Sequence, residues 1–182
     1  MKRLTVYMLL MLLALGLTAC AGSKQSGDNA GNEPAYQGPL TGSWTCVEQG
    51  VHGNTLYVWS FGEDGRFAYL CTAYEPPQGS GDIKSSVRER FFRGKFSETD
   101  GTIECYEVKF DDYFTWGDKW RYFPDRDPAL LAEKLFETKL KKSKNADDFT
   151  MSFEITDTAT IRIAIDRGDP FEQYDMEFVL IP

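Results

Sequence analysis

His52 is the only histidine of this 182-residue sequence, and it stands between Gly50 and Gly53 in an expected turn. One histidine cannot build the usual histidine-rich zinc sites, and no two cysteines have the close spacing of a metal knuckle. A Ser-His-Asp triad that used His52 would lack the Gly-x-Ser-x-Gly elbow. We therefore expect an exposed loop histidine and no metal site.

Carboxylates are abundant, but a glycosidase needs two of them facing each other across a cleft. The sequence singles out no such pair, and it contains no phosphate-binding glycine loop and no calcium loop. The tripeptide 167–169 spells the adhesion sequence Arg-Gly-Asp, yet it precedes Pro170 in an expected turn, where glycine and aspartate are common. The sequence therefore predicts no catalytic residue and no cofactor. The acids considered are Glu89, Asp111, Asp112, Asp125, Asp127, Asp147 and Asp148.

The chain is acidic, with a formal net charge of −8. Residues 1–19 hold two of the 20 basic residues and none of the 28 acidic ones, so residues 20–182 carry −10. A nucleic-acid-binding protein normally presents a basic face. We therefore expect no nucleic-acid partner.

The N-terminus has the pattern of a secretory signal. Lys2 and Arg3 precede an apolar run over 6–17, which ends in Leu-Thr-Ala before Cys20. The run is too short for a transmembrane helix, which needs roughly 20 apolar residues. The sequence therefore predicts export of the chain.

The ending Leu-Thr-Ala-Cys resembles a bacterial lipobox. That resemblance implies cleavage before Cys20, a lipidated Cys20 thiol and an acylated new N-terminus. Several acyl chains together would hold the protein on a membrane, which one chain does only marginally. Ala21 after the cysteine implies the outer membrane if the host has two membranes. Residues 20–39 are rich in Gly, Ser and Pro and are expected to be a disordered tether. Residues 40–182 then form one domain.

The domain is predicted to be all-β, because short alternating segments rich in aromatic and β-branched residues are separated by turn residues. Eight or nine strands at this spacing indicate a barrel or a sandwich. The expected strands are 43–48, 55–61, 66–74, 88–96, 102–110, 119–123, 150–156, 158–166 and 175–181.

One helix is expected over about 127–143. Asp127 can cap it, Pro128 suits its first turn, and Leu131 and Leu135 begin an apolar stripe. The lysines between 139 and 144 would then meet the negative end of the helix dipole, which explains this basic cluster without a binding patch. We expect the helix to cover one end of the sheet.

The segment 40–75 resembles bacterial lipocalin-like domains found behind lipoprotein signals. It carries Gly42-x-Trp44 at the start of the first strand, an Asp-Gly turn at 64–65, and Phe67. The resemblance implies an antiparallel up-and-down barrel in which Trp44 packs across the base and Gly42 permits close approach. The expected helix lies before the last strands, which departs from the lipocalin pattern.

Aromatic side chains make up 14% of the chain, and several share one strand face. A barrel of about eight strands either fills with side chains or holds one small ligand. The shared face could line a pocket for an apolar molecule or form the packed core, and we favour the core. Its residues are Tyr57, Trp59, Phe61, Phe67 and Tyr69.

Three cysteines besides Cys20 leave at least one thiol without a disulfide. Cys46 and Cys71 fall on the first and third expected strands, roughly 10 Å apart, which is beyond the Cα separation of about 7 Å that a disulfide spans. Cys105 lies on a later strand. We therefore expect three cysteines without disulfides.

These observations predict a lipid-anchored, non-enzymatic protein of the bacterial cell envelope that binds a small hydrophobic ligand. The main alternative is an envelope protein–protein interaction module with a filled core, and a hydrolase is a third and weaker alternative. An enclosed apolar cavity would favour the ligand, and an exposed aromatic patch would favour a protein partner.

Overall fold

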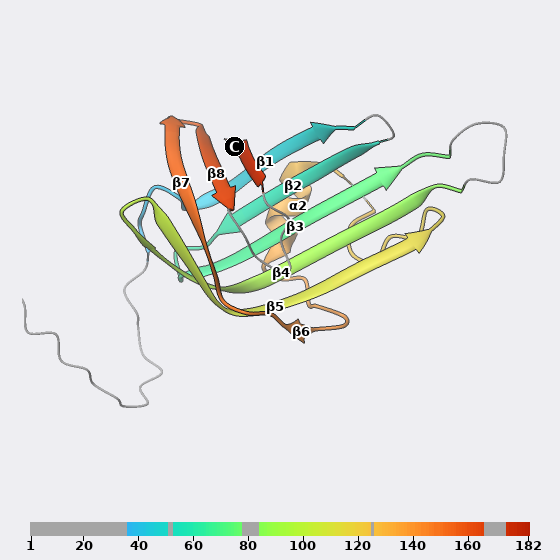
Figure 1. The fold of residues 1–182 in the computed structure, drawn as a ribbon, viewed down its shortest axis with the longest axis horizontal. Coiled ribbons are helices and arrows are strands. Elements are labelled where there is room, and N and C mark those ends of the chain that lie inside the picture. The colour runs from blue at the N-terminus through green and yellow to red at the C-terminus, as the bar shows by residue number, and fades with distance from the viewer. Residues whose placement is uncertain (1–35, 51–52, 78–83, 125, 166–173) are drawn as a thin grey trace, which may run out of the picture. The chain divides into compact units, whose positions relative to one another are not determined.

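The computed structural model describes residues 36–50, 53–77, 84–124, 126–165 and 174–182 (Figure 1). The predicted signal segment, Cys20, His52 and the tripeptide 167–169 lie outside the described residues. Among the described residues, no helix has the length and apolar character needed to cross a membrane.

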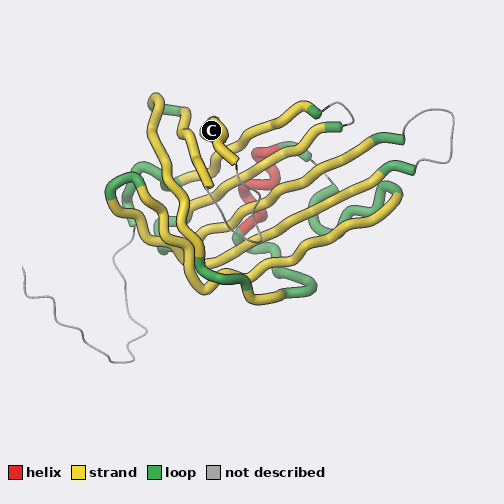
Figure 2. Tube along the Cα trace, in the orientation of Figure 1, coloured by secondary structure: helices red, strands yellow, loops and turns green. Residues whose placement is uncertain are grey.

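The prediction of an all-β domain is confirmed, with one short helix, α2, at Pro128–Leu135 (Figure 2). Most predicted strands are present, but 119–123 is not a strand. The strands are β1 (Gly42–Gln49), β2 (Asn54–Phe61), β3 (Arg66–Glu75), β4 (Ser86–Thr99), β5 (Thr102–Trp116), β6 (Lys144–Asn145), β7 (Phe149–Asp157), β8 (Thr160–Ile165) and β9 (Tyr174–Leu180).

The predicted antiparallel barrel is also confirmed. The sheet order is β4-β3-β2-β1-β9-β8-β7-β5-β6, and a further pairing between β4 and β5 closes the ring. Eight strands form the ring, and β6 pairs only with β5 at its side. Each ring strand is antiparallel to both of its neighbours. When β6 is left out, neighbouring strands of the ring are also consecutive in the chain, and the first strand, β1, pairs with the last, β9.

Asp-Gly turns set the register of two hairpins. Gly65, between β2 and β3, has φ 70, and Asp100 and Gly101, between β4 and β5, have φ 50 and 78. Two successive residues with positive φ match the turn type that fits the twist of paired strands. Both turns thus join strands that are neighbours in the sheet.

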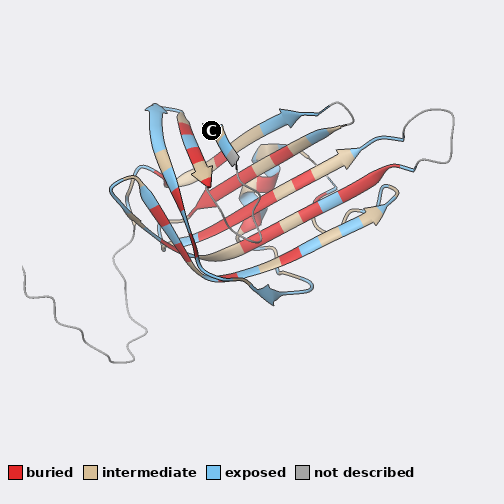
Figure 3. Cartoon of the chain, viewed as in Figure 1, coloured by how far each residue is buried: buried red, intermediate tan, exposed pale blue. Residues whose placement is uncertain are grey.

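The sequence suggested that the helix covers one end of the sheet, but this prediction is wrong. The helix contacts β2 and β3, and Leu131 and Leu135 pack there against Leu56 and Leu70, on the side of the sheet opposite the barrel interior. Strands β2 and β3 therefore carry buried residues on both faces, and Figure 3 colours most of their length buried or intermediate. The outward residues Leu56, Val58 and Leu70 are apolar and buried, so they need such a cover.

The helix also ends at Leu135 rather than near 143. The Arg93 guanidinium on β4 donates to the carbonyls of Phe136 and Thr138. Beyond them, the Lys142 N–H donates to Asp111 at 3.0 Å. These contacts hold the backbone on the sheet, so the lysines from 139 to 144 are not the last turn of a helix.

Trp44 is buried, with 3% of its surface exposed, and its indole Nε1 donates to the Leu40 carbonyl at 2.9 Å. It pairs with Leu180 where β1 meets β9 and closes the ring. Gly42 has φ 126, and a Cβ there would lie 3.1 Å from Leu180. The folded body also begins before Leu40, since the Tyr36 ring packs edge-on against Phe96, with centroids 4.8 Å apart.

Candidate functional site

Strands β1–β5 continue past the residues where β7 and β9 pair with them. Strand β9 pairs with β1 only at Trp44 and Thr45, and β7 pairs with β5 only over 102–105. Figure 1 shows the long strands β1–β5 extending beyond β7 and β8. The inner face of this extension is the candidate site, and we call it the concave face.

A row of five aromatic side chains crosses the inner face at the start of this extension. Each residue is directly opposite the next in register, and neighbouring rings lie close, with centroids 4.4 Å apart for Trp59 and Tyr69 and 5.4 Å apart for Phe92 and Phe110. Such ring pairs stabilise beyond their buried area. The aromatic row is Trp44, Trp59, Tyr69, Phe92 and Phe110.

Most of the aromatic residues proposed for a ligand pocket belong to this packed core. Trp59, Phe61, Phe67 and Tyr69 each have at most 3% of their surface exposed, and the Trp59 and Phe61 rings stack with centroids 5.7 Å apart. Tyr57 differs, because it is only partly buried and lies beyond the aromatic row. The structure thus separates the five predicted residues into four core residues and one at the concave face.

The next row toward the open part of the sheet is polar. It offers two thiols, a phenol, a guanidinium and a carboxylate, again in direct register across β1–β5. Alternation places it on the same face as the aromatic row, two residues further along each strand. The polar row is Cys46, Tyr57, Cys71, Arg90 and Asp112.

Two guanidinium groups converge on one carboxylate in this region. Arg88 Nη2 lies 3.1 Å from Asp112 Oδ2, and Arg90 Nε lies 3.8 Å from Asp112 Oδ1. The Arg88 and Asp112 side chains are 44% and 38% exposed, so solvent and small solutes reach them. Two guanidinium groups and one carboxylate therefore meet at this corner of the concave face.

The opposite corner is acidic and holds protonated groups. The Tyr57 hydroxyl donates to Glu48 Oε2 at 3.0 Å. Burial, and then the neighbouring Cys71, raises the pKa of Tyr57. Burial, and then the charge of Glu48, raises the pKa of the Cys46 thiol. At neutral pH this corner therefore presents a phenol and a thiol in their neutral forms.

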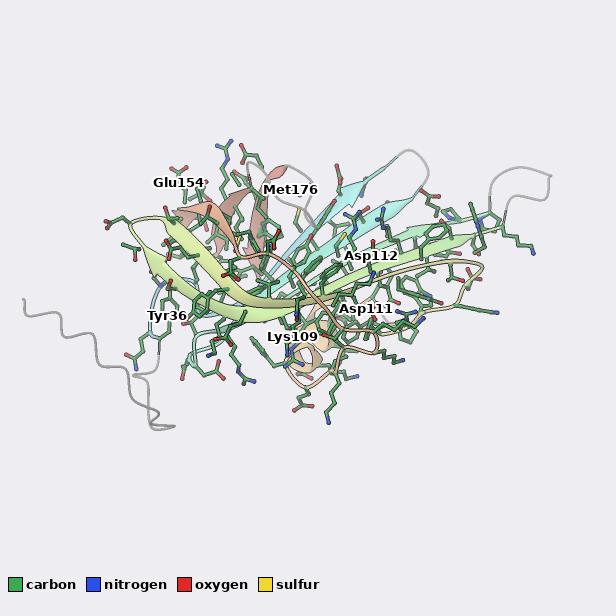
Figure 4. The ribbon with its side chains drawn as sticks, turned by 60° about the horizontal axis from the view of Figure 1, so that its bottom comes forward. Tyr36, Lys109, Asp111, Asp112, Glu154 and Met176 are labelled. Carbon is green, nitrogen blue, oxygen red and sulfur yellow. The ribbon has the colours of Figure 1, made fainter. Side chains whose placement is uncertain are left out.

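Phe114 and Trp116 continue the inner face of β5 beyond Asp112. They are 52% and 61% exposed, and their rings meet edge to face with centroids 5.3 Å apart. Alternation along β5 puts them on the side of Asp112 and opposite Asp111, and Figure 4 shows these two aspartates on opposite sides of the strand. Two exposed aromatic rings beside a charged corner form an amphipathic surface.

Glu89 and Asp111 lie on the outer face and are fully engaged in holding a loop. The Glu89 carboxylate accepts backbone N–H bonds from Arg121, Tyr122 and Phe123 at distances from 2.6 to 3.2 Å. Asp111 pairs with the Arg121 guanidinium at 2.8 Å. The backbone of 121–123 is thus bound by a carboxylate instead of a neighbouring strand, which explains why the strand predicted there is absent.

The predicted absence of disulfides among Cys46, Cys71 and Cys105 agrees with the structure. Cys46 and Cys71 flank Tyr57 on the two neighbouring strands, as the strand order required. Cys105 is buried in the core, whereas Cys46 and Cys71 are only partly buried. Nowhere in the described ranges do three or more His, Cys, Asp or Glu residues gather as a metal site would need.

Comparison with known proteins found no match, since no family model, no curated protein and no solved structure is significantly similar to the chain.

Sequence reasoning missed Arg90 as a site residue and considered Asp112 only as one of several carboxylates that form no evident catalytic pair. The signal was present, because Arg90 is two residues from Phe92 and Asp112 is two residues from Phe110, so each shares the phase of an inward aromatic residue. The alignment of the two strands was the missing information. Arg90 and Asp112 are 22 positions apart in the chain, and only the β4–β5 register places them side by side.

Proposed function

We propose that this protein is a lipid-anchored cell-envelope protein whose lipocalin-like barrel binds one small amphipathic ligand on its concave face. The observation that carries the proposal is the polar row lying directly beside the aromatic row, on the part of β1–β5 that extends past β7 and β9. Ligand sites combine apolar surface with a few placed polar groups. The concave face has both.

The charges favour a ligand with an acidic group. Arg88 and Arg90 share Asp112, and guanidinium groups bind carboxylates, sulfonates and phosphates through paired N–H donors. Phe114 and Trp116 offer apolar surface next to these donors. The ligand would place its acidic group at Arg88 and Arg90 and its apolar part on the two exposed rings.

Anilinonaphthalene sulfonate, an anionic amphipathic dye, tests this site in a fluorescence titration of the full chain in neutral detergent. The variants Arg88→Gln and Trp116→Ala should each raise the dissociation constant of the dye by about tenfold, since each removes one of the two binding elements. Ile155→Ala is the control, because Ile155 is also exposed, at 49%, but lies on β7. A dye affinity unchanged in Arg88→Gln and Trp116→Ala would overturn the proposal.

The anchor rests on the signal segment and Cys20 and is tested separately. Cys20→Ser should release the domain from membranes or leave uncleaved precursor, because no thiol remains to be acylated. Cell fractionation and the mass of the mature N-terminal peptide report both outcomes. Wild-type protein found mainly in the soluble fraction, without lipid mass on Cys20, would exclude lipid anchoring.

A protein partner is the second candidate occupant of the concave face, and the exposed pair Phe114 and Trp116 favours it. Exposed aromatic residues are typical of the energetic centre of protein interfaces. A photoreactive residue at position 116 would crosslink one envelope protein in the host if this candidate is correct, and the same residue at position 155 would not. Native mass spectrometry of the protein purified from its host would instead reveal a bound small molecule if the first candidate is correct.

A further inference from the structure

A pocket of about 390 Å³ lies on the outer face of the sheet, between β3–β5 and the segment 136–143. It is separate from the concave face, because its strand residues Arg66, Arg93 and Lys109 alternate with the inward residues Phe67, Phe92 and Phe110. Lys109 and Asp112 show this in Figure 4, where they lie on opposite sides of β5. Phe136 and Leu140 form part of its wall. We call it the outer pocket.

The charge of the outer pocket is unusual for an acidic chain. Five cationic side chains and one carboxylate line it, although the whole chain has a formal net charge of −8. The cations come from three strands and from the segment after the helix. They are Arg66, Arg93, Lys95, Lys109 and Lys139, and the carboxylate is Glu107.

The sheet register places four of these cations in two directly opposed cross-strand pairs. Arg66 is directly opposite Lys95 across β3 and β4, and Arg93 is directly opposite Lys109 across β4 and β5. Like charges in directly opposed positions destabilise a sheet. Two such pairs side by side on one face therefore call for anionic neutralisation.

The described neighbours neutralise this charge only in part. Arg66 pairs with Asp64, and Lys95 Nζ lies 3.0 Å from Glu107. Arg93 donates to carbonyl oxygens, at 2.7 Å for Thr138. No ion pair within the described residues joins Lys109 or Lys139 to a carboxylate, so these two ammonium groups are available to a ligand.

A glycine at the base of the pocket lets the backbone pack closely against its neighbours. The β4–β5 register shifts between Arg93 and Lys95, and Gly94 occupies the bulge. A Cβ at Gly94 would lie 2.7 Å from the Phe67 ring and 2.8 Å from the Tyr106 carbonyl, so no side chain can fill this position. Across the bulge, Glu107 has φ 54 and its N–H donates to Asp148 at 3.1 Å.

We propose that the outer pocket binds a phosphate group, carried either by a soluble phosphate ester or by the headgroup of an anionic phospholipid. A phosphate has several acceptor oxygens and a charge that matches the converging Arg and Lys donors. The volume exceeds that of one ion, and the apolar wall at Phe136 and Leu140 suits an organic substituent. This inference does not depend on the ligand of the concave face.

Isothermal titration calorimetry of the full chain in neutral detergent tests the proposal. Pyrophosphate and short-chain phosphatidylglycerol are the two probes, with short-chain phosphatidylcholine as the lipid control. The tighter of the two phosphate probes identifies the source of the ligand. If the wild-type chain binds neither pyrophosphate nor phosphatidylglycerol, the proposal is wrong.

Lys109→Gln with Lys139→Gln should weaken binding of the preferred probe by about tenfold or more, since two charge-assisted contacts are lost. Lys84→Gln with Lys119→Gln is the matched control, because both lysines are exposed, lie outside the pocket lining and change the net charge equally. Equal weakening in both double variants would indicate an effect of net charge alone and would overturn the site.

The variant Glu107→Gln should change the affinity for the phosphate probe in the opposite direction. It keeps the shape of the side chain and removes the one carboxylate of the pocket lining, so affinity for the phosphate probe should rise by about threefold. A merely structural role of this residue would lower the affinity or leave it unchanged, and either result would contradict the proposed site. Dye binding at the concave face should stay the same in all these variants.

Discussion

The two faces of the β1–β5 sheet bind their charged groups in different ways. On the concave face, partners lie on neighbouring strands, as Arg88 and Asp112 do. On the outer face, Lys95 and Glu107 also pair across β4 and β5. Asp111 and Arg93, however, bind Arg121 and the carbonyl of Thr138, which belong to the segment between β5 and β6. The concave face is therefore ordered by strand register, whereas the outer face is ordered in addition by a segment that returns to cover it.

This difference explains where each face remains open. On the inner face, the strand register brings the side chains of the aromatic row together in the core. Phe114 and Trp116, at the end of β5, stay exposed. The covering segment buries Glu89 and Asp111 on the outer face but leaves the outer pocket uncovered between it and the sheet. The two candidate binding surfaces are thus accessible at different places. The concave face is open at the end of the sheet, and the outer pocket is open between the sheet and the covering segment.

The largest expected effect is on the inner core. Trp44→Ala should lower the free energy of unfolding by about 3–5 kcal/mol, as truncation of a buried tryptophan does. The matched change Trp120→Ala removes a tryptophan that stacks on Tyr74 outside the inner core and should cost less. Chemical denaturation measures both. An unchanged midpoint for Trp44→Ala would remove the main support for a base-closing role of Trp44.

The next effect is on the outer face. Asp111→Asn should cost about 3 kcal/mol, because it leaves the largely buried Arg121 guanidinium, 15% exposed, without its carboxylate. Hydrogen exchange should show faster exchange in 119–123 and 141–142 before any change in the core strands. If exchange rises uniformly across the barrel, the covering segment is not a separate unit of the outer face.

Alkaline pH should weaken the fold through two partly buried phenols. Burial, and then Glu98, raises the pKa of Tyr36 to about 12, and burial, and then the bond to Asp111, raises that of Tyr122 to about 12. Because the folded state keeps these protons and the unfolded state loses them near pH 10.0, stability should fall as pH rises from 10.0 to about 12. Phenolate absorbance measured against pH reports the raised pKa values of the two phenols. The variant Tyr122→Phe should remove one phenol from those that titrate near pH 12.

The last prediction concerns the reactivity of the cysteine thiols and involves no change in the free energy of unfolding. The unfolded, unreduced protein should show three reactive thiols besides Cys20, from Cys46, Cys71 and Cys105. In the folded state Cys105 should react most slowly, because burial raises its pKa well above the usual value. Titration with a thiol reagent decides this. One reactive thiol in the unfolded state would contradict the strand order of β1–β3.

Local patterns in the chain predicted the strands and their hairpins well. The alternation of Tyr57, Trp59 and Phe61 identifies the inner face of β2, and the Asp-Gly turn at 64–65 identifies the hairpin of β2 and β3. The separation of Cys46 from Cys71 follows from the same strand order. These features depend on neighbours within about ten residues, so the sequence carries them directly.

The helix and its surroundings could not be predicted in this way. The sequence favours a helix to about 143, but Arg93 and Asp111 bind the backbone of this segment and end the helix at Leu135. The segment 119–123 has the composition of a strand, yet Glu89 takes its N–H groups. In both places a side chain distant in sequence competes with local secondary structure and wins, because it satisfies several backbone groups at once.

The sequence by itself determined the all-β fold class, the approximate positions of most strands and the side chains that share each strand face. Only the tertiary structure decided which faces meet and what they bring together. The polar row joins residues 46 to 112 across five strands, and the outer pocket adds Lys139 to cations from β3, β4 and β5. Alternation is a property of one strand, whereas register and covering depend on contacts between distant segments. Both candidate sites are built from such contacts.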